Sequence, residues 1–502
     1  MAPPPTNTAE APAAAPDARS WMERLWSSIA DRGRTHASAL RPGGSVAPLD
    51  RTRGLADALL SERGEASGAA VARELMACLR TLAPEDRLAF YRYVSEGFLP
   101  AEAPLRAAAQ AYLDDPTPGR AAALADAAEP SRQELLRRMN MAPGGTAALV
   151  ELRKDLLAQG RGDTALHALD ADMRHLFASW FNRGFLDLRR IDWQTPAAVL
   201  EKLIAYEAVH EIEGWDDLRR RLAPDRRCFG FFHPALPGEP LIFVEVALTT
   251  GLATAIQPLL AREGEEQATG DRAAAADTAI FYSISNCQDG LRGVSFGNFL
   301  IKQVVEELQA ELPGITRFST LSPVPGFRRW LRGRLGAEDR AGLLRDADAQ
   351  ALRAADGGTE DAAEALQHLL EREDWPGDPA IAGVLEQVLP RLCALYLATP
   401  TAAGRPGDPV ARFHLGNGAR LERVNWLGNT APRGMAESYG MMVNYLYDPA
   451  QIEANHEAFV RGTIVRSPAV DALLGGPSAS EGGAARRSRK DTPAAANAPV
   501  KA

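Results

Sequence analysis

The sequence predicts an α+β protein, in which an all-helical N-terminal domain precedes a mixed α/β domain that carries a helical insertion. Apolar residues recur at helical spacing from Trp21 to about Arg190. From about Arg226 the pattern changes to short apolar runs separated by Gly and Pro turns, which is typical of strands. Acidic, Ala-rich helical segments return between about residues 335 and 400, and these predict the insertion.

Domain boundaries follow from these changes in composition. With 502 residues, the chain is long enough for two or three domains. We predict a disordered Ala/Pro-rich leader at 1–18, a helical domain at 19–190, a mixed catalytic domain at 191–465 with its insertion at about 335–400, and a disordered tail at 466–502. The tail carries the basic cluster Arg486–Lys490, for which a solvated tail is the simpler explanation.

The helical domain contains amphipathic segments without a chemical motif. Val71–Leu79 and Leu149–Leu157 place apolar residues at i, i+3 and i+4, and Pro84, Pro116 and Gly144-Gly145 separate such runs. Scaffolding or self-association is therefore the role expected of this domain. We expect a homo-oligomer, a dimer or a tetramer, formed through it.

The mixed domain is predicted to alternate strands with one long helix. Four strand-like runs are predicted: Cys228–Phe232, Leu241–Leu248, Ala279–Ser285 and Arg317–Leu321. The helix Asn298–Leu308 lies between the last two. Three later runs, Ala411–Leu415, Arg420–Val424 and Met441–Tyr445, are predicted as further strand or helix material.

Composition excludes several classes of function. The net charge of −9 has no basic stripe within it, so a nucleic-acid partner is not expected. Four widely spaced cysteines and the absence of a His-x-x-x-His pair indicate neither a disulfide framework nor a metal site. We found no apolar run long enough to span a bilayer and no secretory signal, so we expect a reduced, cytoplasmic protein without a membrane partner.

The segment Phe318–Phe327 combines two prolines, a glycine and three hydroxyls. Proline fixes φ and removes a backbone donor, so this segment cannot continue as a helix or a central strand. A rigid turn that presents hydroxyls is a plausible place for a catalytic serine. The alternative is a Ser-Pro turn that only reverses the chain.

A glycine-bearing loop precedes the helix at Asn298–Leu308. Gly290, Gly293 and Gly297 would let backbone N–H groups approach a ligand, and a helix N-terminus favours a pyrophosphate. The pattern is neither a Walker loop nor a Rossmann fingerprint, and glycines in this position can also simply form a turn. The strand–glycine loop–helix arrangement resembles the coenzyme A pyrophosphate site of GNAT-type acyltransferases.

One histidine differs from the others. His414 lies in Arg412–Ala419, which we interpreted as a strand running into a Gly-Asn-Gly turn. A satisfied structural histidine is the alternative to a catalytic one. Six other histidines lie in helical-looking stretches or turns and are expected to serve packing or the surface: His36, His167, His175, His210, His233 and His368.

Several motifs in a fixed order resemble the malonyl-CoA decarboxylase family from about Leu152 to Asp448. These motifs are Trp180-Phe181, Gly184–Leu186, Glu207–His210, Tyr282–Ser285, Leu291–Val294, Phe299–Lys302, Phe318–Phe327, Phe413–Ala419, Val424–Trp426 and Arg433-Gly434. The resemblance implies a helical domain followed by a GNAT-like catalytic domain. It also implies the conversion of malonyl-CoA to acetyl-CoA and CO₂, with no metal and no cofactor beyond the coenzyme A of the substrate.

The resemblance assigns roles to individual residues. Ser322 and His414 match the catalytic residues of the family, and both also belong to the malonyl-CoA site. The rest of that site matches Arg292, Gly293, Val294, Ser295, Phe296, Gly297 and Asn298. We expect Ser322 to orient the malonyl group and His414, at an ordinary pKa near ~6.5, to donate the proton.

Two alternatives remain open at this point. A GNAT-type acyltransferase would share the fold but require an acceptor amine. A non-catalytic acyl-CoA-binding scaffold would bind the substrate without turnover.

Overall fold

The computed structural model describes residues 47–261, 266–294, 300–337, 342–400 and 406–475. The predicted leader at 1–18 lies outside these residues, as does the tail beyond 475. The chain forms two compact units. The first is the chain up to Trp180 together with Asp289–Val294, and the second is Phe181–Gln288 together with the chain from Ser295 onward.

The first unit is helical, as predicted. Its α-helices are α2 (Pro48–Leu60), α3 (Glu62–Thr81), α4 (Pro84–Gly97), α5 (Glu102–Asp114), α6 (Pro118–Ala128), α7 (Ser131–Asn140), α8 (Gly145–Gln159) and α9 (His167–Trp180). The two amphipathic runs lie in α3 and α8, and their apolar faces supply fully buried core residues such as Leu75 and Leu149. The short 3₁₀ turn η4 (Asp289–Leu291) packs against α8 and completes the unit.

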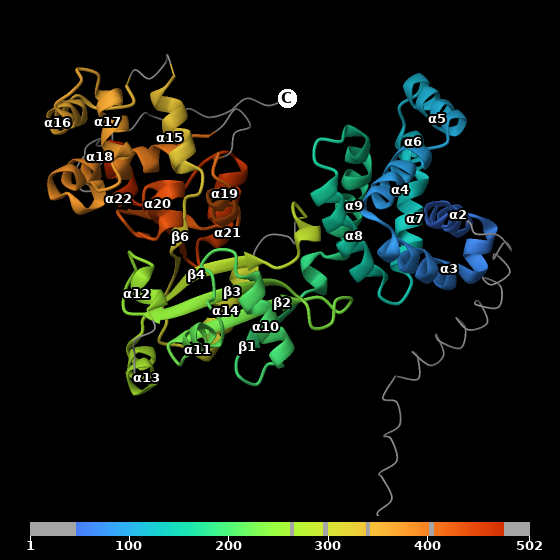
Figure 1. The fold of residues 1–502 in the computed structure, drawn as a ribbon, viewed down its shortest axis with the longest axis horizontal. Coiled ribbons are helices and arrows are strands. Elements are labelled where there is room, and N and C mark those ends of the chain that lie inside the picture. Colours follow the sequence, from blue (N-terminus) through green and yellow to red (C-terminus); the bar gives the residue numbers. More distant parts are fainter. Residues whose placement is uncertain (1–46, 262–265, 295–299, 338–341, 401–405, 476–502) are drawn as a thin grey trace, which may run out of the picture. The chain divides into compact units, whose positions relative to one another are not determined.

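The second unit is built on one mixed, eight-stranded sheet (Figure 1). Its strands are β1 (Asp187–Ile191), β2 (Arg226–Phe232), β3 (Pro240–Thr249), β4 (Thr278–Asn286), β5 (Arg317–Thr320), β6 (Ser322–Pro323), β7 (Arg420–Asn425) and β8 (Met442–Tyr447). The strand order is β1-β2-β3-β4-β5-β8-β6, and β7 also pairs with β8. All pairs are antiparallel except β4 with β5.

Helices cover the sheet. Helix α14 (Leu300–Glu311) makes the crossover between the parallel strands β4 and β5. Leu200 and Leu203 of α10 (Ala197–Tyr206) pack with Cys228 and Phe243 of the sheet in one apolar cluster. The other helices that flank the sheet are α11 (Trp215–Arg221), α12 (Gln257–Leu260), α13 (Glu266–Ala275), α19 (Pro409–Gly416), α20 (Pro432–Ser438), α21 (Ile452–Val460) and α22 (Pro468–Leu474).

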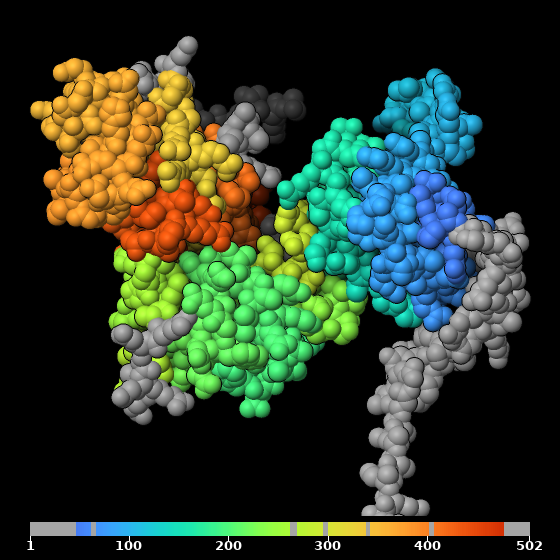
Figure 2. Space-filling model, in the orientation of Figure 1, coloured from blue at the N-terminus to red at the C-terminus, as the bar shows by residue number. Residues whose placement is uncertain are grey.

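The predicted insertion is helical and folds as one compact mass, orange in Figure 2. It follows α15 (Phe327–Leu335) and contains α16 (Asp346–Asp356), α17 (Ala362–Glu371) and α18 (Pro379–Ala398). The predicted fold class, a helical unit followed by a mixed α/β domain with a helical insertion, is therefore confirmed.

Among the described residues, one helix, α18, is long and apolar enough to cross a membrane by length and composition alone. Glu386 and Arg391 interrupt its apolar run. Of its most apolar window, 61% is buried inside the protein. Arg391 is itself buried and forms an ion pair with Asp348 of α16 at 3.1 Å, so α18 is packed as a core helix.

Three local predictions were wrong. Strand β1 lies in the stretch predicted to be helical up to 190, because it is an edge strand with one buried residue, Ile191, and shows little apolar alternation. Helix α22 lies within the predicted tail, where Val470 is buried. His414 lies on helix α19, not on a strand, because Pro409 and the cap at Asp408 start a helix there.

Candidate active site

Ser322 and His414 are brought together although 92 residues separate them in the chain. The Oγ of Ser322 lies 3.1 Å from Nε2 of His414, and both side chains are buried. Ser322 also donates a hydrogen bond to Oγ1 of Thr320 at 2.9 Å. That Thr320 oxygen accepts a further hydrogen bond from the backbone N–H of Tyr445 at 3.1 Å. The serine hydroxyl is thus held from two sides.

Short strand β6 explains where the serine points. Ser322 and Pro323 pair with Val443 and Met442 of β8 at the end of the strand order, where proline costs no ladder hydrogen bond. The chain then turns, and helix α15 begins at Phe327. A Cβ at Gly326 would approach the hydroxyl of Tyr396 to 2.2 Å, so this turn has room only for glycine. Within Phe318–Phe327, Phe318–Thr320 complete β5, which lies between β4 and β8, and Ser322-Pro323 form β6. The prediction that this segment cannot continue a central strand was therefore wrong for its first three residues, and the chain turns only after Pro323.

Helix α19 places His414 and is anchored at its first turn. The buried carboxylate of Asp408 accepts hydrogen bonds from the N–H groups of Val410 and Ala411, each at 2.9 Å. The helix ends in a Gly-Asn-Gly turn in which Gly418 has a φ of +83°, a conformation that favours glycine. A cap at one end and a tight turn at the other fix the last turn of α19, which carries His414.

Two tyrosines of β8 surround the imidazole of His414. The hydroxyl of Tyr447 lies 2.9 Å from Nδ1, and the ring of Tyr445 is stacked on the imidazole with centroids 4.7 Å apart. Burial lowers the pKa of His414 to about 3. The expectation of an ordinary pKa near ~6.5 was therefore wrong, because it ignored the loss of water around the ring.

The hydrogen bonds fit one arrangement of protons. Burial raises the pKa of Tyr447 well above its usual range, so its neutral hydroxyl can donate to Nδ1 of His414. Nε2 of a neutral imidazole then carries the proton and donates to Ser322, which in turn donates to Thr320. Hydrogen bonds therefore run from Tyr447 through His414 and Ser322 to Thr320, and the proton on Nε2 of His414 points at the serine.

The site lies where two strands part. β4 and β5 pair in parallel from Thr278 and Arg317 to Phe281 and Thr320, and the N–H of Leu321 still reaches the carbonyl of Phe281 at 2.9 Å. Beyond that point β4 continues to Asn286, and no described strand pairs with that edge of it. Ser322 follows directly after the last shared hydrogen bond. The parting leaves unpaired backbone groups on β4 that a ligand can use.

The predicted coenzyme A loop is described only in part. Arg292, Gly293 and Val294 belong to the first unit, whereas Ser295, Phe296, Gly297 and Asn298 lie outside the described residues. Gly293 has a φ of +76° and Arg292 is exposed, paired with Asp289 at 2.7 Å. A Cβ at Gly290 would approach the carbonyl oxygen of Val150 to 1.9 Å, so α8 and η4 meet too closely for any other residue.

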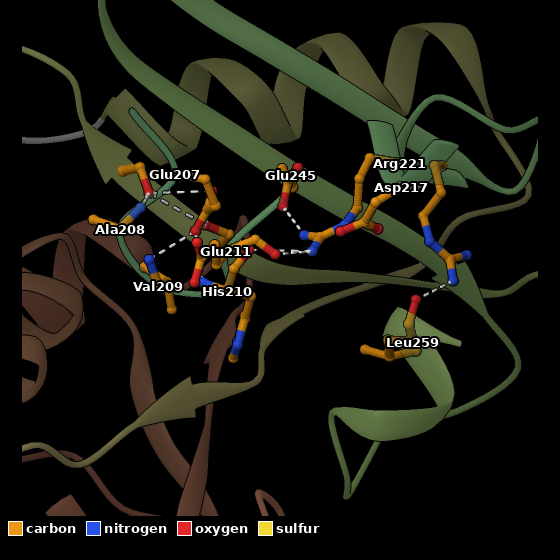
Figure 3. Close-up of polar contacts among 12 residues, drawn as sticks. Glu207, Ala208, Val209, His210, Glu211, Asp217, Arg221, Glu245 and Leu259 are labelled. Atoms are coloured by element: carbon orange, nitrogen blue, oxygen red, sulfur yellow. Dashed lines mark hydrogen bonds and ion pairs between the residues drawn. The ribbon is translucent and has the colours of Figure 1, made fainter. Parts of the chain in front are cut away.

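A short strap, defined here as Glu207–Glu213, lies beside the unpaired half of β4 (Figure 3). The Glu207 carboxylate accepts hydrogen bonds from the Ser283 hydroxyl at 2.8 Å and from the N–H of His210 at 2.7 Å. The Ser285 hydroxyl accepts from the N–H of Ala208 at 3.2 Å. The motifs Glu207–His210 and Tyr282–Ser285, far apart in the sequence, therefore form one contact.

Two side chains that hold the pair, those of Tyr447 and Thr320, were not predicted from the sequence. Tyr447 shares its face of β8 with Tyr445, and that alternation was the one available signal. Thr320 lies inside the segment singled out, two residues before Ser322. The strap residue His210 was expected to serve packing because it lies in a helical-looking stretch, although Glu207–His210 also belongs to the motifs of the family resemblance.

Solved structures show the same fold. The chain is similar to the crystal structure of malonyl-CoA decarboxylase from Rhodopseudomonas palustris, with 52% identity and a TM-score of 0.76 over 84% of this chain and 99% of that one. It is also similar to the enzyme of the same name from Cupriavidus metallidurans, with 39% identity and a TM-score of 0.66 over 85% and 98% of the two chains.

Curated relatives agree with these structures. The protein named malonyl-CoA decarboxylase, mitochondrial, from Anser anser anser is 42% identical over 340 residues, which make up 66% of this chain and 66% of that protein. The chain therefore spans about two thirds of the length of that relative. Sequence models of the malonyl-CoA decarboxylase N-terminal and C-terminal domains match residues 98–181 and 184–483. With more than half of its length matched, the chain belongs to the malonyl-CoA decarboxylase family.

Proposed function

We propose that this protein decarboxylates malonyl-CoA to acetyl-CoA and CO₂. The observation that carries the proposal is the buried chain of hydrogen bonds from Tyr447 through His414 to Ser322, placed where β4 and β5 part. Membership of the family supplies the substrate. The coenzyme A part of the substrate is assigned to Arg292–Asn298, as the sequence predicts.

The reaction needs a place for an electron pair and a source for one proton. The bond between the malonyl Cα and its carboxyl carbon breaks, and its electron pair moves into the thioester as an enolate while CO₂ leaves. Because the thioester itself accepts the electrons, the residues present need no metal for this step. The carbon of the enolate then takes up a proton to give acetyl-CoA.

We assign that proton to Nε2 of His414. The low pKa means that the free enzyme holds a neutral imidazole at physiological pH. A neutral imidazole N–H is still a far stronger acid than the methyl group of a thioester, so the transfer to carbon is downhill. The ring is left anionic, stabilised by the hydroxyl of Tyr447, until a solvent proton restores it.

Ser322 is assigned to orientation. Its hydroxyl has one proton to give, which here goes to Thr320. With substrate bound, that proton would be directed to the malonyl group and would hold it against His414. Placing the reacting carbon near the donor in advance removes much of the entropic cost of the transfer.

The experiment supplies malonyl-CoA alone, without any acceptor. A decarboxylase forms acetyl-CoA and CO₂ in equal amounts, an acyltransferase forms neither until an amine is added, and a binding protein forms neither at all. His414→Asn should lower kcat by roughly 10²–10⁴-fold while binding of acetyl-CoA persists. Wild-type turnover in this variant would remove His414 from the mechanism.

A further inference from the structure

We propose that His210 is a second catalytic histidine, whose Nε2 donates a hydrogen bond to the thioester oxygen as that oxygen becomes an enolate. The inference rests on the proposed function and adds the group that stabilises the intermediate. Three observations support the inference. The strap fixes the backbone of this residue, the ring has a nitrogen without a hydrogen-bond partner among the described residues, and the ring lies close to β4.

The backbone of His210 is held from both sides. Its N–H donates to the Glu207 carboxylate at 2.7 Å, and its carbonyl accepts from the Arg221 guanidinium at 3.1 Å. Arg221 is in turn fixed by buried ion pairs with Glu245 at 2.7 Å and Asp217 at 3.2 Å (Figure 3). These contacts fix the main chain of His210, and burial limits the space into which its ring can turn.

The ring itself takes no part in that network. Figure 3 shows the His210 side chain directed away from Glu207 and Arg221. His210 is only 8% exposed, and its Nε2 has no hydrogen-bond partner among the residues that the structure describes. Leaving a buried polar atom without a partner costs about 1–3 kcal/mol. A ligand that accepts a hydrogen bond from this nitrogen would remove that cost.

The His210 ring lies near the proposed reaction centre. The backbone of Tyr282 lies close enough to the ring to favour its protonated form. Tyr282 is the extra residue of a β-bulge in β4 and follows Phe281, whose carbonyl makes the last hydrogen bond to the β5 chain before Ser322. Strand spacing then puts His210 and Ser322 on the order of 10 Å apart. A thioester lying between them can meet both.

The charge around His210 suits an oxyanion. Burial, followed by the positive charges of Arg221 and Arg433, lowers the pKa of His210 to about 4. The ring is therefore neutral at physiological pH, and the potential at its position favours a negative ligand. A neutral imidazole can carry its proton on Nε2, and an oxyanion selects that form.

The thioester oxygen fits this donor better than the malonyl carboxylate does. The carboxylate leaves as neutral CO₂, so a strong hydrogen bond to it would stabilise the substrate more than the transition state. The thioester oxygen gains charge as the bond breaks, so a donor fixed there binds the transition state more tightly than the substrate.

The test compares His210→Leu, His210→Gln and His210→Asn. Loss of one such donor should lower kcat by about 10²–10³-fold. Acetyl-CoA labelled at the thioester carbonyl reports the contact without turnover, because a hydrogen bond lowers the infrared stretching frequency of that carbonyl. In the wild type the bound band should lie below that of free acetyl-CoA, and in His210→Leu it should return to the free position. Glutamine, whose amide nitrogen reaches about as far as Nε2, should recover part of the shift and rate, and the shorter asparagine should not.

Controls separate this contact from a structural role. His175→Leu removes an exposed histidine of α9 and should leave the band and the rate unchanged. If His210→Leu does not fold, the glutamine and asparagine variants carry the comparison. Identical carbonyl bands in the wild type and in a folded donor-free variant, or an unchanged kcat, would overturn the role of His210. Failure of the wild type to release CO₂ from malonyl-CoA would instead overturn the proposed function.

Discussion

At the scale of single residues, the site depends on an imidazole that burial keeps neutral. His414 is stacked on Tyr445 and hydrogen-bonded through both nitrogens, and its pKa is lowered to about 3. An ordinary histidine acid would work as an imidazolium and would lose its proton as the pH rises above its pKa. The donor that we propose is instead the neutral N–H.

The pH dependence of kcat/KM distinguishes these two donors. With a pKa of about 3, His414 keeps the same protonation state from about pH 5.5 to 8, so kcat/KM for malonyl-CoA should not fall as the pH passes 6.5. A free-enzyme imidazolium acid with an ordinary pKa would lose about tenfold in rate per pH unit above that value. Initial rates measured over this range decide the point, and a tenfold fall per unit would contradict a neutral donor.

The two tyrosines of β8 provide a matched pair of substitutions. Tyr447→Phe removes the hydroxyl bonded to Nδ1 of His414 and should lower kcat by about tenfold to a hundredfold, corresponding to roughly 1–3 kcal/mol for an unpaired buried group. Tyr445→Phe keeps the stacked ring and removes a buried hydroxyl that has no hydrogen-bond partner among the described residues, so it should change kcat little. Equal losses in the two variants would show that the hydroxyl on Nδ1 has no special role.

At the scale of elements, helix α19 and the parting strands place His414 and Ser322, the proposed catalytic pair. The helix begins at a cap that contacts two N–H groups, and its last turn carries His414. A substitution that removes the cap at the start of this short helix should therefore displace His414 at its end and lower the reaction rate.

Two aspartate caps test that link. Asp408→Ala removes the cap of α19 and should cost about 1–2 kcal/mol of stability and lower kcat. Asp378→Ala removes the equivalent cap of α18, which holds the N–H of Ala380 at 3.0 Å, and should lower stability by a similar amount with kcat retained. Thermal unfolding and turnover are measured for both. A loss of turnover in Asp378→Ala as large as in Asp408→Ala would mean that general destabilisation explains the effect.

Elements with a strong apolar pattern could be predicted from the sequence. Elements whose conformation depends on tertiary contacts could not. β3 and β4 are buried on both faces and are mostly apolar, interrupted by Glu245 in β3 and by Ser283 and Ser285 in β4. Edge strand β1 and helix α19 are short and mostly polar or mixed, so tertiary pairing and a cap decide their conformation. The pairing of Ser322 with His414 was expected from a family resemblance, but spacing in the chain carries no information about a contact over 92 residues.

The same limit explains the residues that were missed. His210 and Tyr447 gain their properties from burial and from the groups around them, which no local pattern contains. Glu207–His210 and Tyr282–Ser285 were noted as separate motifs. Only the folded chain shows that one carboxylate joins them.

At the scale of the whole molecule, the proposed reaction uses only side chains and the substrate's own thioester. Incubation with EDTA, followed by removal of the chelator complex, should therefore leave decarboxylation unchanged. If this treatment abolished activity and a divalent cation restored it, the reaction would need a metal that the proposed mechanism does not include.

The most direct test of the central claim is the release of CO₂ from malonyl-CoA in the absence of any acceptor, measured for the wild type, Ser322→Ala and His414→Asn. The account predicts equal amounts of acetyl-CoA and CO₂ from the wild type. It predicts a loss of kcat of roughly 10²–10⁴-fold in His414→Asn and a slower release of CO₂ in Ser322→Ala, with acetyl-CoA binding kept in both. Wild-type rates in both variants, or acetyl-CoA formed only when an amine is supplied, would contradict it.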